Sequence, residues 1–152
     1  MGANNIRRGP LGAIVVSLSV VMMTAAVWAQ ASEWLEQVDA QLAGIRDEIG
    51  GEFEAASDIM VGELAQAEIG EFTLQVNEGV EYFFMAVCDA DCGDVDMALF
   101  DEDDNELVSD IEQDDYPYLH FGANQSGVWT VRVLMANCGA DTCLWGAQGY
   151  AR

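Results

Sequence analysis

The chain has 152 residues, with 27 Asp or Glu against five Arg and no Lys, and its formal net charge is −22 at pH 7. It therefore has no basic patch that could follow a phosphate backbone, which excludes nucleic acid as a partner and disfavours anionic membrane surfaces. The same charge keeps an exported protein soluble and makes divalent cations plausible companions.

Residues 1–29 have the pattern of a secretory signal peptide. Arg7 and Arg8 precede an apolar run over residues 13–29, and small residues stand where a signal peptidase needs them, at Ala29 and Ala31. An uncleaved anchor is the alternative, but the run is shorter than the roughly 20 residues of a spanning helix. We expect cleavage, export to the periplasm or the exterior, and a mature chain without a membrane span. Its charge is 3 minus 27, or −24.

Residues 32–50 are predicted to form an amphipathic helix that packs on its own domain, with pairing to a partner as the alternative. Ser32 is a suitable N-cap, and Gly50 follows the last turn. Apolar residues recur at spacings of three and four, namely Trp34, Leu35, Val38, Leu42, Ile45 and Ile49.

From about residue 62 the apolar residues recur at period two, which is typical of strands. The segment 80–88 is apolar on both sides and is predicted to lie centrally in a sheet. The other predicted strands are 72–76, 95–100, 107–110, 116–122, 128–136 and 143–150, separated by Gly, Asp and Asn turns. They predict an all-β fold with one N-terminal helix, an antiparallel β-sandwich of seven to eight strands of the jelly-roll or immunoglobulin-like kind.

The alternation also predicts which side chains point into the sandwich. Deleting a large one, as in Trp129→Ala, is expected to cost about 3 to 5 kcal/mol. The predicted inward set is Phe72, Leu74, Tyr82, Phe84, Met97, Leu99, Trp129, Val131 and Val133.

Four cysteines in an exported chain predict two disulfides. The chain-entropy model gives each local pair about 2 kcal/mol and a crosslink from Cys88 to Cys138 about 4 kcal/mol. Spacing favours the local pairs, Cys88–Cys92 and Cys138–Cys143, because each lies in an Asp/Gly-rich segment where a turn brings the sulfurs together. We predict the local pairs and keep the crosslinked pairing as the alternative.

Zinc and catalytic histidine chemistry are both disfavoured. Neither cysteine spacing is the usual two-residue zinc knuckle, and His120 alternates with apolar neighbours as a strand residue does. With one histidine and no G-x-S-x-G elbow, a nucleophilic triad is improbable. A secreted hydrolase using paired carboxylates stays the alternative, because carboxylate separation is a spatial property. We predict a non-catalytic binding or accessory module whose partner is an unidentified protein or polysaccharide of the cell envelope or exterior.

A family resemblance rests on short turn-based motifs: "FTLQVNEGVEYFF", then "DVDMALFDEDDNELVSD", then a proline-containing strand, then "SGVWTVRVLM". This succession resembles the bacterial pre-peptidase C-terminal (PPC) domain, a β-sandwich often appended to secreted proteases. The resemblance covers residues 62–150 of a domain that we place at 62–152. It implies the sandwich fold and a broad non-catalytic binding role. No peptidase is present on this chain, and the paired cysteines are additions that make it similar to small standalone exported relatives.

The acidic stretch after residue 88 raises the question of calcium. Asp101, Asp103 and Asn105 match ligand positions of an EF-hand loop, but Glu106 stands where that loop needs glycine. Residues 101–105 are therefore predicted to be a hairpin turn.

An earlier acidic group, Asp89, Asp91, Asp94 and Asp96, lies in a loop that a local disulfide would tighten. In some collagen-binding relatives of the resembling sandwich, acids at the Asp-x-Asp strand entry hold calcium, and Asp94 and Asp96 match that motif. The resemblance thus implies a weak calcium site on these two residues with help from Asp89 or Asp91. Solvated turns without metal are the alternative.

Overall fold

The computed structural model describes residues 18–152, with side chains from Trp34 onward. Most of the predicted signal peptide, residues 1–17, lies outside the described residues, and the chain divides into two units at residues 1–32 and 33–152. Within residues 18–152, no helix has the length and apolar character needed to cross a bilayer. The elements are α1 (Leu18–Ile49), β1 (Glu54–Ala55), β2 (Met60–Leu64), β3 (Ile69–Val76), β4 (Glu81–Cys88), β5 (Cys92–Phe100), β6 (Glu106–Asp110), β7 (Tyr118–Gly122), β8 (Gly127–Cys138) and β9 (Cys143–Ala151).

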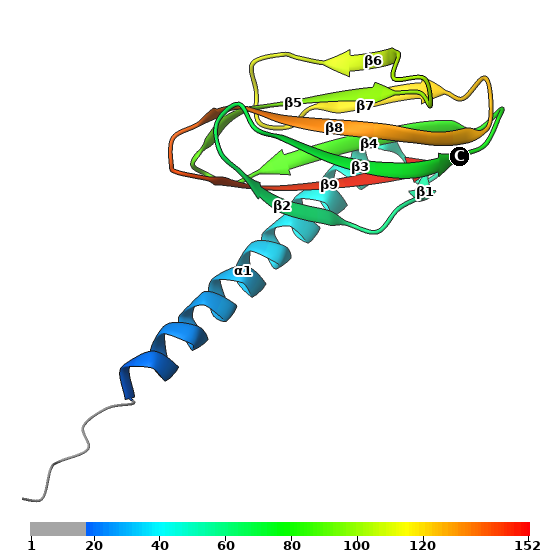
Figure 1. Ribbon diagram of the computed structural model, residues 1–152. Helices are drawn as coiled ribbons and strands as arrows, with labels where there is room; N and C mark the ends of the chain where they lie inside the picture. Colours follow the sequence, from blue (N-terminus) through cyan, green and yellow to red (C-terminus); the bar gives the residue numbers. More distant parts are fainter. Residues whose placement is uncertain (1–17) are drawn as a thin grey trace, which may run out of the picture. The chain divides into compact units, whose positions relative to one another are not determined.

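The strands form two antiparallel sheets that stack as a sandwich (Figure 1), which confirms the predicted fold class. Sheet A has the order β1-β9-β4-β7, with β2 also paired to β9, and sheet B has the order β3-β8-β5-β6. The short strands β1 and β2 were not individually predicted. Strand β4 lies inside sheet A between β9 and β7, as its two-sided apolar sequence predicts.

The core between the sheets is built by the inward side of each alternating strand. Trp129 is 2% exposed and is the largest fully buried side chain. Eight of the nine residues predicted to point inward are buried, and Phe72, the ninth, is partly buried against the same core. Only one face of each sheet packs on this core, so inward-facing and outward-facing side chains alternate along each strand. The period-two pattern of the sequence therefore identified the inward-facing residues.

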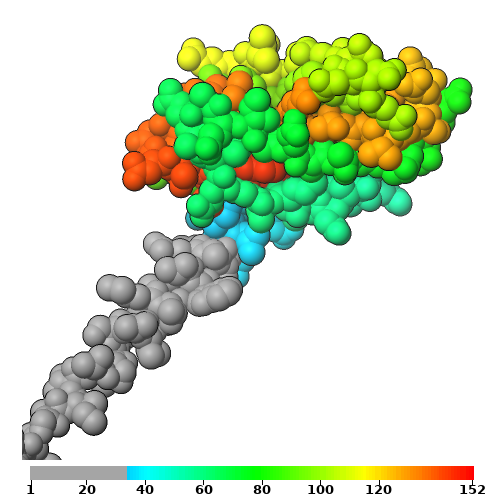
Figure 2. Space-filling view, in the orientation of Figure 1, coloured from blue at the N-terminus to red at the C-terminus, as the bar shows by residue number. Residues whose placement is uncertain are grey.

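A second core lies on the outer face of sheet A, under the C-terminal half of α1. Val38 and Leu42 of the helix pack there with Met85, Val87 and Tyr150 of the sheet. In Figure 2 the helix residues from Trp34 onward, in blue and cyan, lie against the strands. The helix starts at Leu18, so Ser32 lies inside it, and the prediction that Ser32 is its N-cap was wrong. Residues 18–31 contain no Gly or Pro that would interrupt the helix.

Candidate functional site: a groove between α1 and β7

Two adjoining hollows lie between helix α1 and the edge strand β7, over the floor that β4 provides. Together we call them the α1–β7 groove. One end has a volume of about 290 Å³ and the other about 300 Å³, and Ile45 and Tyr116 line both ends. The remaining lining residues are Gln41, Glu48 and Ile49 of α1, Phe83, Met85, Val87 and Cys88 of β4, and Asp115 and Tyr118 of the β7 side.

The floor of the groove follows from the alternation of β4. Its side chains at 83, 85 and 87 point away from the inter-sheet core and toward the helix. Because α1 covers only part of this face, Met85 and Val87 are buried while Phe83 stays half-buried. An apolar strip therefore remains between the helix and the sheet edge.

Two exposed tyrosines form the outer wall. Tyr116 is 59% exposed and Tyr118 is 57% exposed. Tyr118 pairs in register with Met85, so its side chain lies on the same face, and its ring stacks on Phe83 with the centroids 5.7 Å apart. The backbone carbonyl of Pro117 accepts a hydrogen bond from the amide of Ala86 at 3.1 Å, which ties the tyrosine-bearing segment to β4.

Aspartates fix the backbone of this wall. The amide of Tyr116 donates to Asp114 Oδ1 at 3.1 Å, and the amide of Tyr118 donates to Asp110 Oδ2 at 3.0 Å. These two carboxylates satisfy N–H groups that an edge strand would otherwise leave open, which also blunts the edge against pairing with another chain.

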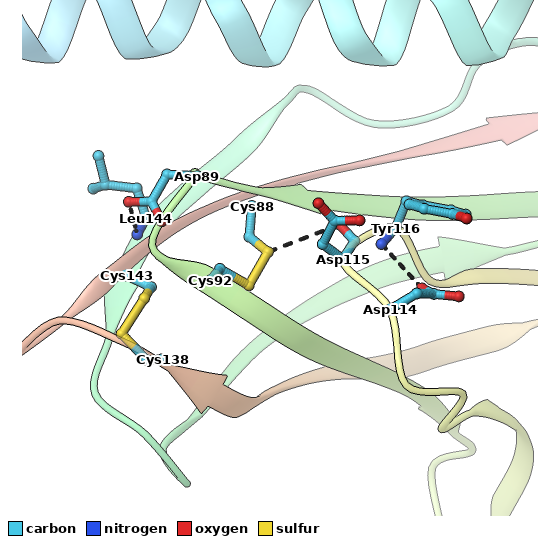
Figure 3. The surroundings of a disulfide bond; sticks show 9 residues. All are labelled: Cys88, Asp89, Cys92, Asp114, Asp115, Tyr116, Cys138, Cys143 and Leu144. Atoms are coloured by element: carbon cyan, nitrogen blue, oxygen red, sulfur yellow. Dashed lines mark hydrogen bonds between the residues drawn. A yellow bond between two sulfur atoms is a disulfide. The ribbon is translucent and has the colours of Figure 1, made fainter.

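A disulfide contacts the segment that forms this wall (Figure 3). Cys88 is bonded to Cys92, and the sulfur of Cys88 contacts the backbone carbonyl oxygen of Asp115 at 3.8 Å. The second disulfide joins Cys138 to Cys143, and Cys92 and Cys138 are register partners on β5 and β8. The cysteines thus form the two local pairs. All four are bonded, and such bonds persist in oxidising compartments, which supports export.

Aromatic rings continue beyond the groove toward the C-terminus. Phe53 lies 6.2 Å from Phe83 and 6.1 Å from His120 between ring centroids. Arg152 lies over the Phe53 ring at 4.7 Å and also pairs with Glu81 and Glu52. His120 is a strand residue on β7, as predicted, and its exposed ring lies 6.1 Å from the rings of Phe53 and Phe83 between centroids.

The four acids predicted to bind calcium are placed differently from one another. Asp89 Oδ2 accepts a hydrogen bond from the amide of Leu144 at 2.9 Å, so this side chain is engaged with β9, and Asp91 is exposed. Asp94 and Asp96 lie on β5, where one oxygen of Asp94 is buried without a hydrogen-bond partner. Burial raises the pKa of Asp96, and the charges of Asp94, Asp110 and Asp114 add to the rise.

Asp96 thus lies near Asp94, near Asp110 at the end of β6, and near Asp114 of the segment that follows this strand. Among residues 18–152, no group of three or more His, Cys, Asp or Glu side chains is arranged to hold a metal ion. Calcium needs several oxygens that converge on one point, and these residues do not present them. Calcium binding stays a prediction from sequence.

The outer face of sheet B has the other described hollow of note, with a volume of about 160 Å³. Asp96 and Arg132 are its charged residues, and exposed Ile69 and Ile111 flank it. Arg132 pairs with Glu71 at 2.5 Å and Asp104 at 2.7 Å and lies over the Phe100 ring at 4.1 Å. The hollow thus holds one carboxylate beside a cation, whereas a glycosidase needs two facing carboxylates.

Sequence reasoning missed the groove. Residues 116–122 were predicted to form a strand, but the face of the sheet on which Tyr116 and Tyr118 lie was not predicted. The available signal was their parity, because Tyr116, Tyr118 and His120 alternate with buried Leu119. The distance between that strand and the helix could not be read from a linear pattern.

Comparisons with known proteins do not assign a family to this chain. No family model matches the sequence, and no curated protein matches it. Among solved structures, the chain is similar to the crystal structure of Aeromonas hydrophila PliG, described as a periplasmic lysozyme inhibitor of g-type lysozyme. The identity is 10%, the match covers 64% of this chain and 88% of that chain, and the TM-score is 0.49. A likeness at this level carries no argument about function, and the PPC resemblance stays a prediction.

Proposed function

We propose that the protein is an exported, non-catalytic binding module and that the α1–β7 groove is its binding surface. The observation that supports this most strongly is the pair of tyrosines, each more than half exposed, at the wall of an apolar groove. Exposed apolar hollows mark interaction sites in soluble proteins, and tyrosine is enriched where partners dock. A tyrosine also offers a large rigid contact surface at a low cost in side-chain entropy.

The positions of the reactive groups support a non-catalytic role. The single histidine lies among Phe53 and Phe83. Asp96 is the described carboxyl group with a raised pKa, and it lies on the outer face of sheet B with Arg132, away from the groove. A paired-carboxylate hydrolase would place two acids in one concave site.

Photo-crosslinking tests the location of the binding surface. We would place p-benzoylphenylalanine at position 118 of the full-length chain, and at position 128 as the control, because Val128 is 47% exposed on β8 of sheet B. We expect one discrete adduct from position 118 in the exporting cell, identified by mass spectrometry, and none from position 128. The adduct should disappear when Tyr116→Ala is added. Equal adducts from both positions, or none from position 118, would overturn the proposed surface.

The hydrolase alternative has its own test. The wild-type protein and its Asp96→Asn variant are incubated with cell-wall polysaccharide, and the release of reducing ends is measured. We expect no release above background from either protein. Release by the wild type that the Asp96→Asn variant lacks would replace the binding module with an enzyme.

A further inference from the structure

We infer that the α1–β7 groove takes a basic polypeptide segment and seats one of its Arg or Lys side chains between Tyr116 and the carboxylates of Glu48 and Asp115. This inference rests on the proposed function above and adds the chemical class of the partner. Three features of the described residues lead to it: the charge of the rim, the aromatic wall and the apolar floor.

The rim of the groove is acidic and has no cation among its lining residues. Glu48 stands on the helix side and Asp115 on the β7 side, and Gln41 is the other polar lining residue. The sequence contains no Lys that could reach the groove from another element. The rim therefore favours a positively charged partner and repels anionic polymers.

Two of the three arginines with described side chains are paired outside the groove, and the third, Arg46, is not among its lining residues. Arg132 pairs with Glu71 and Asp104 on sheet B, and Arg152 pairs with Glu81 and Glu52 near the C-terminus. The charge of Glu48 and Asp115 is thus left for a partner to neutralise.

The tyrosine wall suits the same kind of side chain. A guanidinium or ammonium group is attracted to the face of an aromatic ring, and the interaction strengthens as the site loses water. Arg and Lys also have apolar stems that can lie along Phe83 and Ile45 while the charged end meets the carboxylates. Of the two, Arg matches the site better, because its planar group can stack on Tyr116 and pair with a carboxylate at once.

Matched peptides test the charge requirement on the full-length chain. The probe is a synthetic peptide in which Arg alternates with Leu, and its counterpart has citrulline at every Arg position, which removes the charge and keeps the shape. Dissociation constants are measured at physiological ionic strength, where long-range attraction is screened. We expect the citrulline peptide to bind at least about tenfold more weakly, and Tyr116→Ala to weaken the Arg peptide by about fivefold or more.

A charge-matched pair of variants separates the groove from general attraction to an acidic protein. Glu48→Gln with Asp115→Asn removes two charges at the groove, and Glu78→Gln with Asp103→Asn removes two exposed charges in turns outside it. We expect the groove variant to lose about fivefold or more in affinity for the Arg peptide and the turn variant to lose much less. Thermal unfolding confirms that each variant is folded.

The contrary outcomes distinguish a wrong partner class from a wrong binding surface. Equal weakening by the two charge variants would overturn the inference, since attraction would then be diffuse. Equal binding of the citrulline peptide, or no binding of the Arg peptide, would also overturn it and point to a neutral partner such as a polysaccharide. In those cases a position-specific adduct from residue 118 would still support the groove, so the partner class can fail without the proposed function.

Discussion

On the outer face of sheet A, β4 presents Phe83, Met85 and Val87 to helix α1, whereas the outer face of sheet B is not covered by any helix of the described residues. There the corresponding row on β8 is Thr130, Arg132 and Leu134. Both rows belong to central strands of antiparallel sheets with the same pleat. The first is apolar and ends in a groove, and the second is held by ion pairs to Glu71 and Asp104.

This difference shows what produces a groove in a sandwich. A helix is a cylinder on a nearly flat sheet, so it buries the strands beneath it and leaves the edge strand partly open. Tyr116 and Tyr118 stand at that opening, while the outer face of sheet B has a smaller hollow, of about 160 Å³, beside the ion pairs of Arg132. The covered face is therefore the one that offers an apolar docking surface.

The inter-sheet core, which both faces share, should give the largest loss of stability. Trp129→Ala is expected to lower the free energy of unfolding by about 3 to 5 kcal/mol, because it removes a large, fully buried side chain. Its neighbour Val128 points outward, so Val128→Ala should change stability by at most about 0.5 kcal/mol. Denaturant unfolding measures both, and similar midpoints would show that Trp129 is not in the core.

The docking of the helix on sheet A gives the next largest effect. Leu42 is 1% exposed, on the face of α1 that packs against sheet A. Leu42→Ala should lower the free energy of unfolding by about 3 kcal/mol. Leu35 lies on the same helix but is 47% exposed, and Leu35→Ala should cost about 0.5 kcal/mol or less. If thermal unfolding shows equal losses, the helix is not seated by this stripe and the groove loses its inner wall.

The two disulfides should have the same effect on stability and different effects on binding. Replacing either pair by serines opens a short loop and should cost about 2 kcal/mol in the chain-entropy model. Only Cys88–Cys92 contacts the segment that holds Tyr116, so only its loss should also weaken binding of the Arg peptide. Equal affinity in the two double variants would show that this disulfide does not position the groove.

Two aspartates should respond to pH in opposite directions. Burial raises the pKa of Asp96 above its ordinary value of 3.8, so the native state loses stability as pH rises from 3.8 through the folded pKa. Hydrogen bonds from Asn105 lower the pKa of Asp101, so its stabilising contribution is present above 3.8 and is lost as pH falls through the folded pKa.

The variants follow from these signs. At pH 7, Asp96→Asn should raise the melting temperature relative to Asp101→Asn, and the gap should close as pH falls below 3.8. Each variant removes one negative charge, so general relief of repulsion cancels between them. A gap that persists at low pH would contradict the assigned local causes.

Much of this arrangement could be predicted from sequence because it depends on local alternation. The period-two rows of 72–76 and 128–136 identify inward residues without any knowledge of strand order. The two-sided apolar character of 80–88 also indicated a strand with both faces covered.

The groove could not be predicted in the same way, because it depends on how far α1 lies from β7. Tyr116 and Tyr118 flank a proline in a run that is apolar by composition, and only the position of Ile45 and Ile49 opposite them makes a hollow. The sequence also predicts that Asp89 or Asp91 assists Asp94 and Asp96, whereas in the structure Asp89 accepts a hydrogen bond from the amide of Leu144 and Asp96 lies near Asp110 and Asp114. Long-range placement decided both cases.

Docking of the partner in the α1–β7 groove can be located by amide NMR of the isotope-labelled full-length protein titrated with the Arg peptide. We expect the amide signals around Ile45, Glu48 and residues 115–118 to shift, and the signals of residues 96–100 and 130–134 to stay unchanged. Shifts confined to the outer face of sheet B, or spread evenly over the acidic surface, would show that the peptide does not dock in the groove.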